Sequence, residues 1–136
     1  VEILKIYQLG NDKVKYLGTG LWDDPTLLTN KELVGCWFAS SPMQSYNGFV
    51  TRFEVTNNYT PPRLASLGYD AVALAATLAA SGGFDAANIT SQGGYEGPAN
   101  GIFRFRTNGT IERGLSVLTL TPTGKKDVAV APRMFY

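Results

Sequence analysis

The segment Gly101–Arg113 constrains the fold most, because it has the pattern of a β-hairpin whose register can be worked out. Runs of alternating apolar and charged residues flank the turn-forming Thr107–Gly109. A three-residue loop, a type I turn followed by a left-handed glycine, is one solution, and it puts apolar residues on one face and an ion pair on the other. The resulting cross-strand pairs are Arg106 with Thr110, Phe105 with Ile111, and Arg104 with Glu112. A two-residue loop would set Phe105 against Glu112, which suits neither side chain, so we predict the three-residue loop.

The chain beyond the hairpin is expected to continue the same sheet. Apolar residues carry the second arm on to Leu120, a turn is indicated at Thr121–Gly124, and Asp127–Val130 suits a last short strand. The sequence therefore predicts a C-terminal three-stranded meander.

A long helix is predicted before the hairpin, over Leu64–Ser81, where helix formers dominate and alanines surround the larger apolar residues. A helix that is apolar on nearly every side is normally buried between layers, and we expect that here. Gly82 and Gly83 are predicted to end it. Asp70, near its start, is expected to favour the positive end of the helix dipole.

Helices and strands alternate in the rest of the chain, which indicates the α/β class. The Pro-rich joint at Asn57–Pro62 is the best candidate crossover or hinge. The predicted helices are one around Ile3–Tyr7 ending at Gly10, a short one from Pro25 capped by Asp23 or Asp24, an amphipathic one at Tyr46–Val55 and a short one at Phe84–Thr90 capped near Asp85. The other predicted elements are a strand within Lys13–Gly20, a buried strand at Leu33–Ala39 and a loop at Gly93–Pro98.

Composition excludes several functional classes. A hydrophobic content of 44% with 17% charged residues is ordinary for one globular domain. The net charge of +1, with scattered basic residues, argues against a nucleic-acid partner. The most apolar run, Ala71–Ala80, falls short of the roughly 20 residues that a membrane helix needs. Cys36 is the single cysteine, so it forms no internal disulfide and leaves the redox compartment open; in its apolar run it is expected to be an inert core thiol.

The sequence also argues against an enzyme. The chain has no histidine, which removes histidine-based acid–base catalysis and most zinc sites. The glycines of Gly18–Gly20 lack the pattern of a phosphate-binding loop. Asp23 and Asp24 are adjacent, and adjacent helical side chains point about 100° apart, so they would not converge on a substrate. We predict a non-enzyme without cofactor or metal.

Three segments carry a resemblance to a known family: Gly68–Ala75 with the following Gly82–Asp85, Gly101–Phe105 closing on Asn108-Gly109, and Lys15–Trp22. In their order they resemble the C-terminal part of type 1 periplasmic ligand-binding proteins, the leucine/isoleucine/valine-binding-protein-like receptors of bacterial transport systems, where Lys15–Trp22 resembles a strand and corner of the second lobe. The Arg-bearing hairpin and the Trp22–Asp24 arrangement look most like the penicillin-binding-protein-activator or lipoprotein branch.

The resemblance implies a C-terminal fragment of a two-lobed α/β receptor, with helices packed on a mixed sheet, that closes on a small ligand. Residues 1–60 would be part of the second lobe and residues 61–136 the return segment, and the two would form one compact unit in isolation. The sequence begins without an initiator methionine, a basic n-region or a signal h-region, which indicates that processing or truncation removed the true beginning, and we favour truncation.

The implied function is extracytoplasmic binding of an amino-acid-like solute for an ABC-type uptake system. The partners would be the solute and a membrane transporter, and the location would be periplasmic, with a lipid anchor in a segment outside this chain as one option. The alternative is an envelope regulator on the same fold, such as a penicillin-binding-protein activator, whose partner would be a cell-wall synthase.

By position in the motif, the resemblance implies two groups of ligand-binding residues. Gly20, Leu21 and Trp22 would lie at the second-lobe corner, and Leu64 and Tyr69 near the return into the first lobe. Relatives with an acidic residue at that corner use it to meet an ammonium group, whereas this chain has Gly20, which counts against an amino-acid ligand.

Some of these residues have a second interpretation. Trp22 suits a plug between layers, and Tyr69 an aromatic residue packed on the sheet. Arg104 and Arg106 suit the solvated face of a strand, or a ladder that meets an acidic partner.

Overall fold

The computed structural model describes residues 2–10 and 12–135, and residue contacts group the chain into two compact units. The first unit comprises the chain up to Ser40 together with Ser116–Val130, and the second comprises Ser41–Leu115 with the chain from Ala131 on. These boundaries differ from residue 60, where we divided the chain by analogy with two lobes. The lobe assignment concerns a longer protein and stays a prediction.

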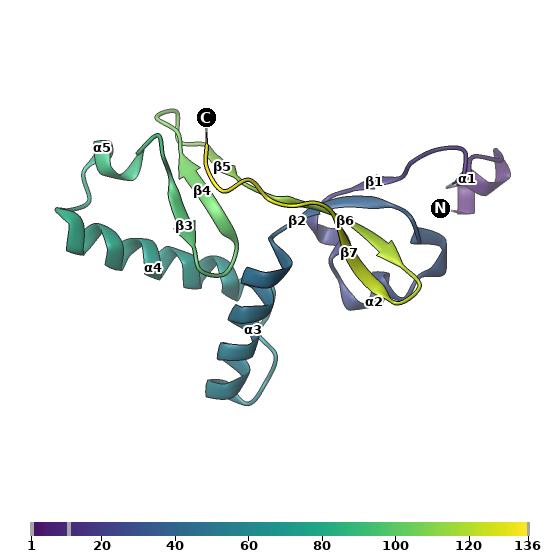
Figure 1. Ribbon diagram of the computed structural model, residues 1–136, viewed down its shortest axis with the longest axis horizontal. Helices are drawn as coiled ribbons and strands as arrows, with labels where there is room; N and C mark the ends of the chain where they lie inside the picture. The colour runs from purple at the N-terminus through teal and green to yellow at the C-terminus, as the bar shows by residue number, and fades with distance from the viewer. Residues whose placement is uncertain (1, 11, 136) are drawn as a thin grey trace. The chain divides into compact units, whose positions relative to one another are not determined.

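The first unit is built on a mixed four-stranded sheet in the order β1-β2-β6-β7 (Figure 1). The strands are β1 (Leu17–Gly18), β2 (Trp37–Ser40), β6 (Ser116–Thr121) and β7 (Gly124–Ala129), and β1 runs parallel to β2 while the other neighbours are antiparallel. The helices are α1 (Glu2–Ile6), the 3₁₀ turns η1 (Gly20–Trp22) and η2 (Lys31–Leu33), and α2 (Pro25–Leu28).

Alternation along β6 places its buried side chains in the core of the first unit, where Leu118 lies opposite Phe38 of β2. Cys36 is fully buried there, which confirms the predicted core thiol, and burial raises its pKa. Burial therefore favours the thiol over the thiolate, which is the reactive form.

The second unit combines three helices with a three-stranded antiparallel sheet in the order β3-β4-β5 (Figure 1). The elements are α3 (Met43–Asn57), α4 (Ala65–Ser81), α5 (Ala86–Ile89), β3 (Tyr95–Gly97), β4 (Gly101–Phe105) and β5 (Ile111–Arg113). Its buried apolar residues include Phe49, Leu78, Ala99, Ile102 and Phe103.

The predicted hairpin register is confirmed. Phe105 pairs with Ile111 and Arg104 with Glu112, and the Arg104 Nε–Glu112 Oε2 distance is 2.8 Å. The Gly109 amide donates to the Arg106 carbonyl over 2.9 Å, and Gly109 has φ 82°, the left-handed conformation that the loop requires.

The predicted meander is wrong, because β5 and β6 belong to different sheets. The Gly114 amide still donates to the Ile102 carbonyl at the end of the hairpin, and the chain then leaves that sheet. The alternating leucines of β6 bury their side chains beside β2 instead, where a packed core is available.

Several other predicted helices and strands are present, but their bounds differ from those we predicted. The short helices begin after Asp24 and Asp85 as predicted, and α3 is longer than the predicted Tyr46–Val55. The strand expected within Lys13–Gly20 is reduced to β1, and Leu33–Ala39 begins as η2 before it becomes β2. The helix α1 is followed by a left-handed Gln8 (φ 55°), where we expected Gly10 to end it.

The loop predicted at Gly93–Pro98 is wrong, since Tyr95–Gly97 forms β3. Glycines made the segment look irregular, but Tyr95 pairs with Phe103 across the sheet and their ring centroids lie 6.2 Å apart.

The helix α4 is not buried on all sides in this structure. Its buried residues are Ser66, Asp70 and Leu78, whereas Val72 is 71% exposed. One face of α4 packs towards β3, whereas Leu67, Tyr69 and Val72 on its other faces are exposed. Composition indicated the helix correctly but not which of its faces is covered.

Candidate functional site

The corner that carries three of the predicted ligand contacts lies in the first unit, directly after β1. Thr19 caps the 3₁₀ turn η1 by accepting a 3.4 Å hydrogen bond from the Leu21 amide. Gly18 allows the Trp22 ring to lie against the backbone of β1, because a Cβ at position 18 would overlap that ring. Gly20 likewise lies close to the Ala39 carbonyl, 3.3 Å from where its own Cβ would be.

Exposure differs among these three residues. The side chain of Leu21 is 83% exposed, while Gly20 and Trp22 are half-buried. Trp22 therefore offers part of its ring to solvent and packs the rest on Gly18, which is compatible with both of its interpretations.

The two adjacent aspartates after the corner, Asp23 and Asp24, make different contacts. Asp24 caps α2, and its carboxylate accepts from both the hydroxyl and the amide of Thr26, which lowers the pKa of Asp24. Asp23 has only 5% of its side chain exposed; it accepts a 2.7 Å hydrogen bond from Ser40 Oγ and one from Lys125 Nζ. The prediction that one of them caps the helix is confirmed for Asp24.

The role of Asp23 has no local sequence signal. Its partner Lys125 lies 102 residues further along the chain, in β7. Only the sheet order, which brings β7 into the first unit, places the two charges together.

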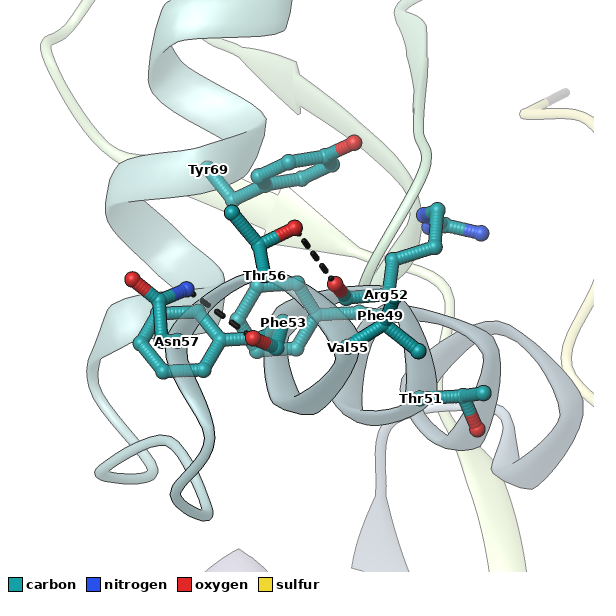
Figure 2. Close-up of a pocket in the computed structure, with 8 residues that line it drawn as sticks. All are labelled: Phe49, Thr51, Arg52, Phe53, Val55, Thr56, Asn57 and Tyr69. Carbon is teal, nitrogen blue, oxygen red and sulfur yellow. Dashed lines mark hydrogen bonds between the residues drawn. The ribbon is translucent and has the colours of Figure 1, made fainter.

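The second candidate surface lies in the second unit, in a groove of about 620 Å³ between α3 and Tyr69 of α4 (Figure 2). The lining residues are Phe49, Thr51, Arg52, Phe53, Val55, Thr56, Asn57 and Tyr69. The spacing of Phe49 and Phe53 on α3 places their tilted rings with centroids 5.9 Å apart, and the centroid of the Tyr69 ring lies 5.2 Å from that of Phe49. The groove therefore has aromatic walls.

Arg52 is the one charged residue among those that line the groove. Its guanidinium carbon lies 5.7 Å from the centre of the Tyr69 ring, and Nη2 donates a long, 3.4 Å hydrogen bond to the Pro98 carbonyl. Such a surface can hold an apolar group against its rings and a carboxylate against the guanidinium.

Of the two residues predicted near the return segment, Tyr69 lines this groove and Leu64 does not. Leu64 stands at the start of α4 and is 75% exposed. Tyr69 packs on α3, where we had offered the sheet as the alternative. Arg52 and Phe53 were missed, because their positions on an amphipathic helix indicated only a packed stripe and a solvated face.

Asp70 does not act through the helix dipole as we expected. It is buried, and its carboxylate accepts from the Ala99 amide (2.8 Å), the Asn100 amide (3.1 Å) and Asn100 Nδ2 (2.8 Å). These bonds tie α4 to the turn between β3 and β4. Gly97 permits the approach, since a Cβ there would lie 2.6 Å from the Asp70 carboxyl carbon.

Within residues 2–10 and 12–135, no three histidine, cysteine, aspartate or glutamate side chains are grouped so as to hold a metal ion. No helix in the same described part is long and apolar enough to cross a membrane.

Among known proteins, the chain is similar to solved structures only at the level of the fold. No protein-family model matches the chain, and no curated protein matches it significantly. A solved protein from Rhodospirillum rubrum, described as a branched-chain amino acid ABC transporter, matches 85% of this chain and 37% of its own length, with a TM-score of 0.72 and 18% identity.

Two further structures match with TM-scores of 0.55. One is the leucine-binding protein LivK from Thermotoga maritima, with 23% identity over 85% of this chain and 36% of its own. The other is an ABC-transporter solute-binding protein from R. palustris in complex with benzoate, with 20% identity over 96% of this chain and 40% of its own.

The chain thus spans 36–40% of the length of these three proteins. The α/β class with a mixed sheet is confirmed, whereas assignment to the penicillin-binding-protein-activator branch stays a prediction. The chain has the fold of part of an ABC-transporter solute-binding protein, and its resemblance to type 1 periplasmic ligand-binding proteins is confirmed at the level of the fold.

Proposed function

We propose that this chain is part of an extracytoplasmic solute-binding protein that serves an ABC-type uptake system and has no catalytic activity. The observation that carries the proposal is the match of 85% of the chain, at a TM-score of 0.72, to a protein described as a branched-chain amino acid ABC transporter. The function consists of capturing a small solute and presenting it to a membrane transporter, in the periplasm.

The proposed ligand is a small molecule with an apolar body and a carboxylate. Aromatic walls and a single guanidinium in the α3–α4 groove support that chemistry (Figure 2). Leucine and benzoate, which are named in the descriptions of two of the similar structures, both combine an apolar body with a carboxylate. Gly20 brings no carboxylate to its corner, so an ammonium group on the ligand would need a partner elsewhere.

We propose Tyr69 and Arg52 as contacts at the groove, and Leu21, with Gly20 and Trp22, as contacts at the corner. Leu64 is retained as a separate contact outside the groove, since its side chain is exposed. The regulator alternative, with a cell-wall synthase as partner, and a lipid anchor have no specific observation in their favour here.

Thermal denaturation of the full-length protein with leucine, isoleucine, valine or benzoate tests the proposal. A ligand at a hundredfold excess over its Kd stabilises the folded state by about 2.7 kcal/mol, which raises the Tm. We expect at least one of these carboxylates to raise the Tm and the matching uncharged amide to raise it less. Absence of a shift with all of them would contradict the proposed ligand class.

Two variants make the test specific to the groove. Arg52→Gln should weaken carboxylate binding and Tyr69→Ala should weaken binding of the apolar body. Arg133→Gln removes an exposed arginine of the same unit that does not line the groove, and it is the matched control. Equal affinities in Arg52→Gln and Arg133→Gln would remove the groove from the proposal and leave the corner.

A further inference from the structure

We propose that Asp23 is a positioning residue for the ligand-facing corner Gly20–Trp22, and that it acts through Lys125 and Ser40. The inference rests on the proposed function in one respect, since it takes this corner as a ligand contact. Asp23 itself is not proposed to touch the ligand, because its side chain is only 5% exposed.

The first support is where the partners of Asp23 come from. Ser40 ends β2 and Lys125 lies in β7, the two strands on either side of β6 in the sheet. One carboxylate thus links the residue directly after η1 to two strands that are far apart in sequence. The hydrogen bonds within the turn, from the Trp22 amide to Thr19 and from the Asp23 amide to Gly20, are local and cannot fix the turn to the sheet.

The second support is the cost of burying a charge. A buried carboxylate is tolerated when it is paired and hydrogen-bonded, and here one oxygen accepts from an ammonium group and the other from a hydroxyl. Removing Lys125 would take the ammonium group away from that buried carboxylate, which favours movement of the aspartate towards water. Such a movement would displace the chain at the corner.

The third support is the neighbour of Asp23 in the chain. Trp22 packs its ring over Gly18, and it follows η1 immediately before Asp23 in the chain. A shift of Asp23 would therefore alter the exposure of the Trp22 ring and the position of the exposed Leu21. The cluster consequently determines the geometry that the corner offers to a ligand.

Fluorescence quenching of Trp22 measures this directly. The chain has two tryptophans, so Trp37→Phe leaves Trp22 as the single reporter in the full-length protein, provided that the remainder of that protein contributes none or has its tryptophans replaced. In this background we expect Asp23→Asn and Lys125→Met each to raise acrylamide quenching of Trp22 towards the value of the denatured protein. The double variant should show no more quenching than either single variant, because both substitutions remove the same interaction between Asp23 and Lys125.

Rescue and control variants separate positioning from a general loss of structure. Lys125→Arg keeps the charge and should retain the low quenching of the parent. Asp127→Asn removes an exposed carboxylate from the same strand and should leave quenching unchanged. Ser40→Ala, which removes one hydrogen bond and no charge, should give an intermediate rise and serves if Asp23→Asn fails to fold.

Affinity completes the test. With a carboxylate that stabilises the parent, we expect Asp23→Asn to bind about tenfold more weakly, a loss of the size seen when outer partners of metal ligands are removed. Quenching in Asp23→Asn equal to that in Asp127→Asn would overturn the positioning role, whatever the affinity. If the parent binds none of the carboxylates, the proposed function fails, while Trp22 quenching still decides whether Asp23 positions the corner.

Discussion

Each of the two units buries an aspartate, and the two carboxylates are satisfied in different ways. Asp70 accepts from two backbone amides and one side-chain amide, all belonging to Ala99 and Asn100. Asp23 accepts from the side chains of Ser40 and Lys125, which lie 17 and 102 residues away. The first carboxylate stabilises a turn of the backbone, and the second depends on side chains from two strands.

This difference determines how each region tolerates change. Two of the three donors to Asp70 are backbone amides, which are present with almost any sequence, so the Asp70 site depends on Asp70 itself, on the Asn100 side chain and on the space that Gly97 leaves. The Asp23 site is weakened when a charge or, to a smaller extent, a hydroxyl is lost at a distant position. We therefore expect the larger loss of stability at Asp70 and the larger loss of local geometry at Asp23.

The largest expected effect is that of Asp70→Ala. It would leave two backbone amides and Asn100 Nδ2 without their acceptor in a buried turn, and we expect a loss of about 3 to 5 kcal/mol in the free energy of unfolding. Urea denaturation followed by far-UV circular dichroism measures it. Asp85→Ala, which removes the exposed cap of α5 and its bond from Asn88 Nδ2, is the control and should cost about 1 kcal/mol. Equal losses in the two variants would contradict the role assigned to Asp70.

Gly97→Ala tests the space beside Asp70. The added Cβ would lie 2.6 Å from the Asp70 carboxyl carbon, which forces the turn and α4 apart, and we expect a loss of about 2 kcal/mol. Gly93→Ala is the matched control, because a Cβ there meets no atom within 4 Å. A Gly97→Ala protein as stable as Gly93→Ala would show that the close approach to Asp70 is not required.

Lys125→Met should have a smaller effect, which Cys36 can report. Cys36 is fully buried in the first unit, and burial raises its pKa, so a thiol reagent should label it only when that unit opens. Because the Lys125 ammonium is partly exposed, we expect a loss of about 1.4 kcal/mol, seen as about tenfold faster labelling. Asp127→Asn should leave the rate unchanged. Equal acceleration by both variants would contradict a specific pair.

Sequence reasoning succeeded where partners lie close together in the chain. The register of the hairpin follows from residues within Arg104–Glu112, and the Asp24 cap from its neighbours. It failed where partners are distant. The alternation of β6 is correct as a strand pattern, but nothing local indicates that Ser116 pairs with Ser40 and not with the preceding hairpin.

The residues of the candidate site show the same contrast between near and distant partners in the chain. Tyr69, predicted by resemblance, does line a groove, but Arg52 and Phe53 enter that groove from α3 and have no motif of their own. Asp23 seemed equivalent to Asp24 as a cap, since the Lys125 that distinguishes it lies in β7. Roles that depend on pairing between strands could not be derived from one sequence.

The smallest expected effect is at the part-exposed Glu112 of the hairpin. Hydrogen bonds from Arg104 and then Arg106 hold the pKa of Glu112 below its ordinary value. Its contribution to stability is therefore complete above about pH 4.3, the ordinary pKa of glutamate, and is lost as the pH falls through the lower pKa of the folded state. Hydrogen exchange of the Arg106 amide, which donates to Thr110, should be faster in Glu112→Gln than in the parent at neutral pH.

That difference should disappear at a pH below the folded-state pKa and shrink in about 1 M salt, where the Debye length is about 3 Å. Glu96→Gln, on the exposed part of β3, is the control and should leave exchange at Arg106 unchanged. A difference that persisted at low pH would mean that the Glu112 side chain acts through packing. Glu112 would then determine structure in the same sense as the buried carboxylates of Asp23 and Asp70. We expect instead that its ion pairs with Arg104 and Arg106 only reinforce a strand register that the turn already imposes.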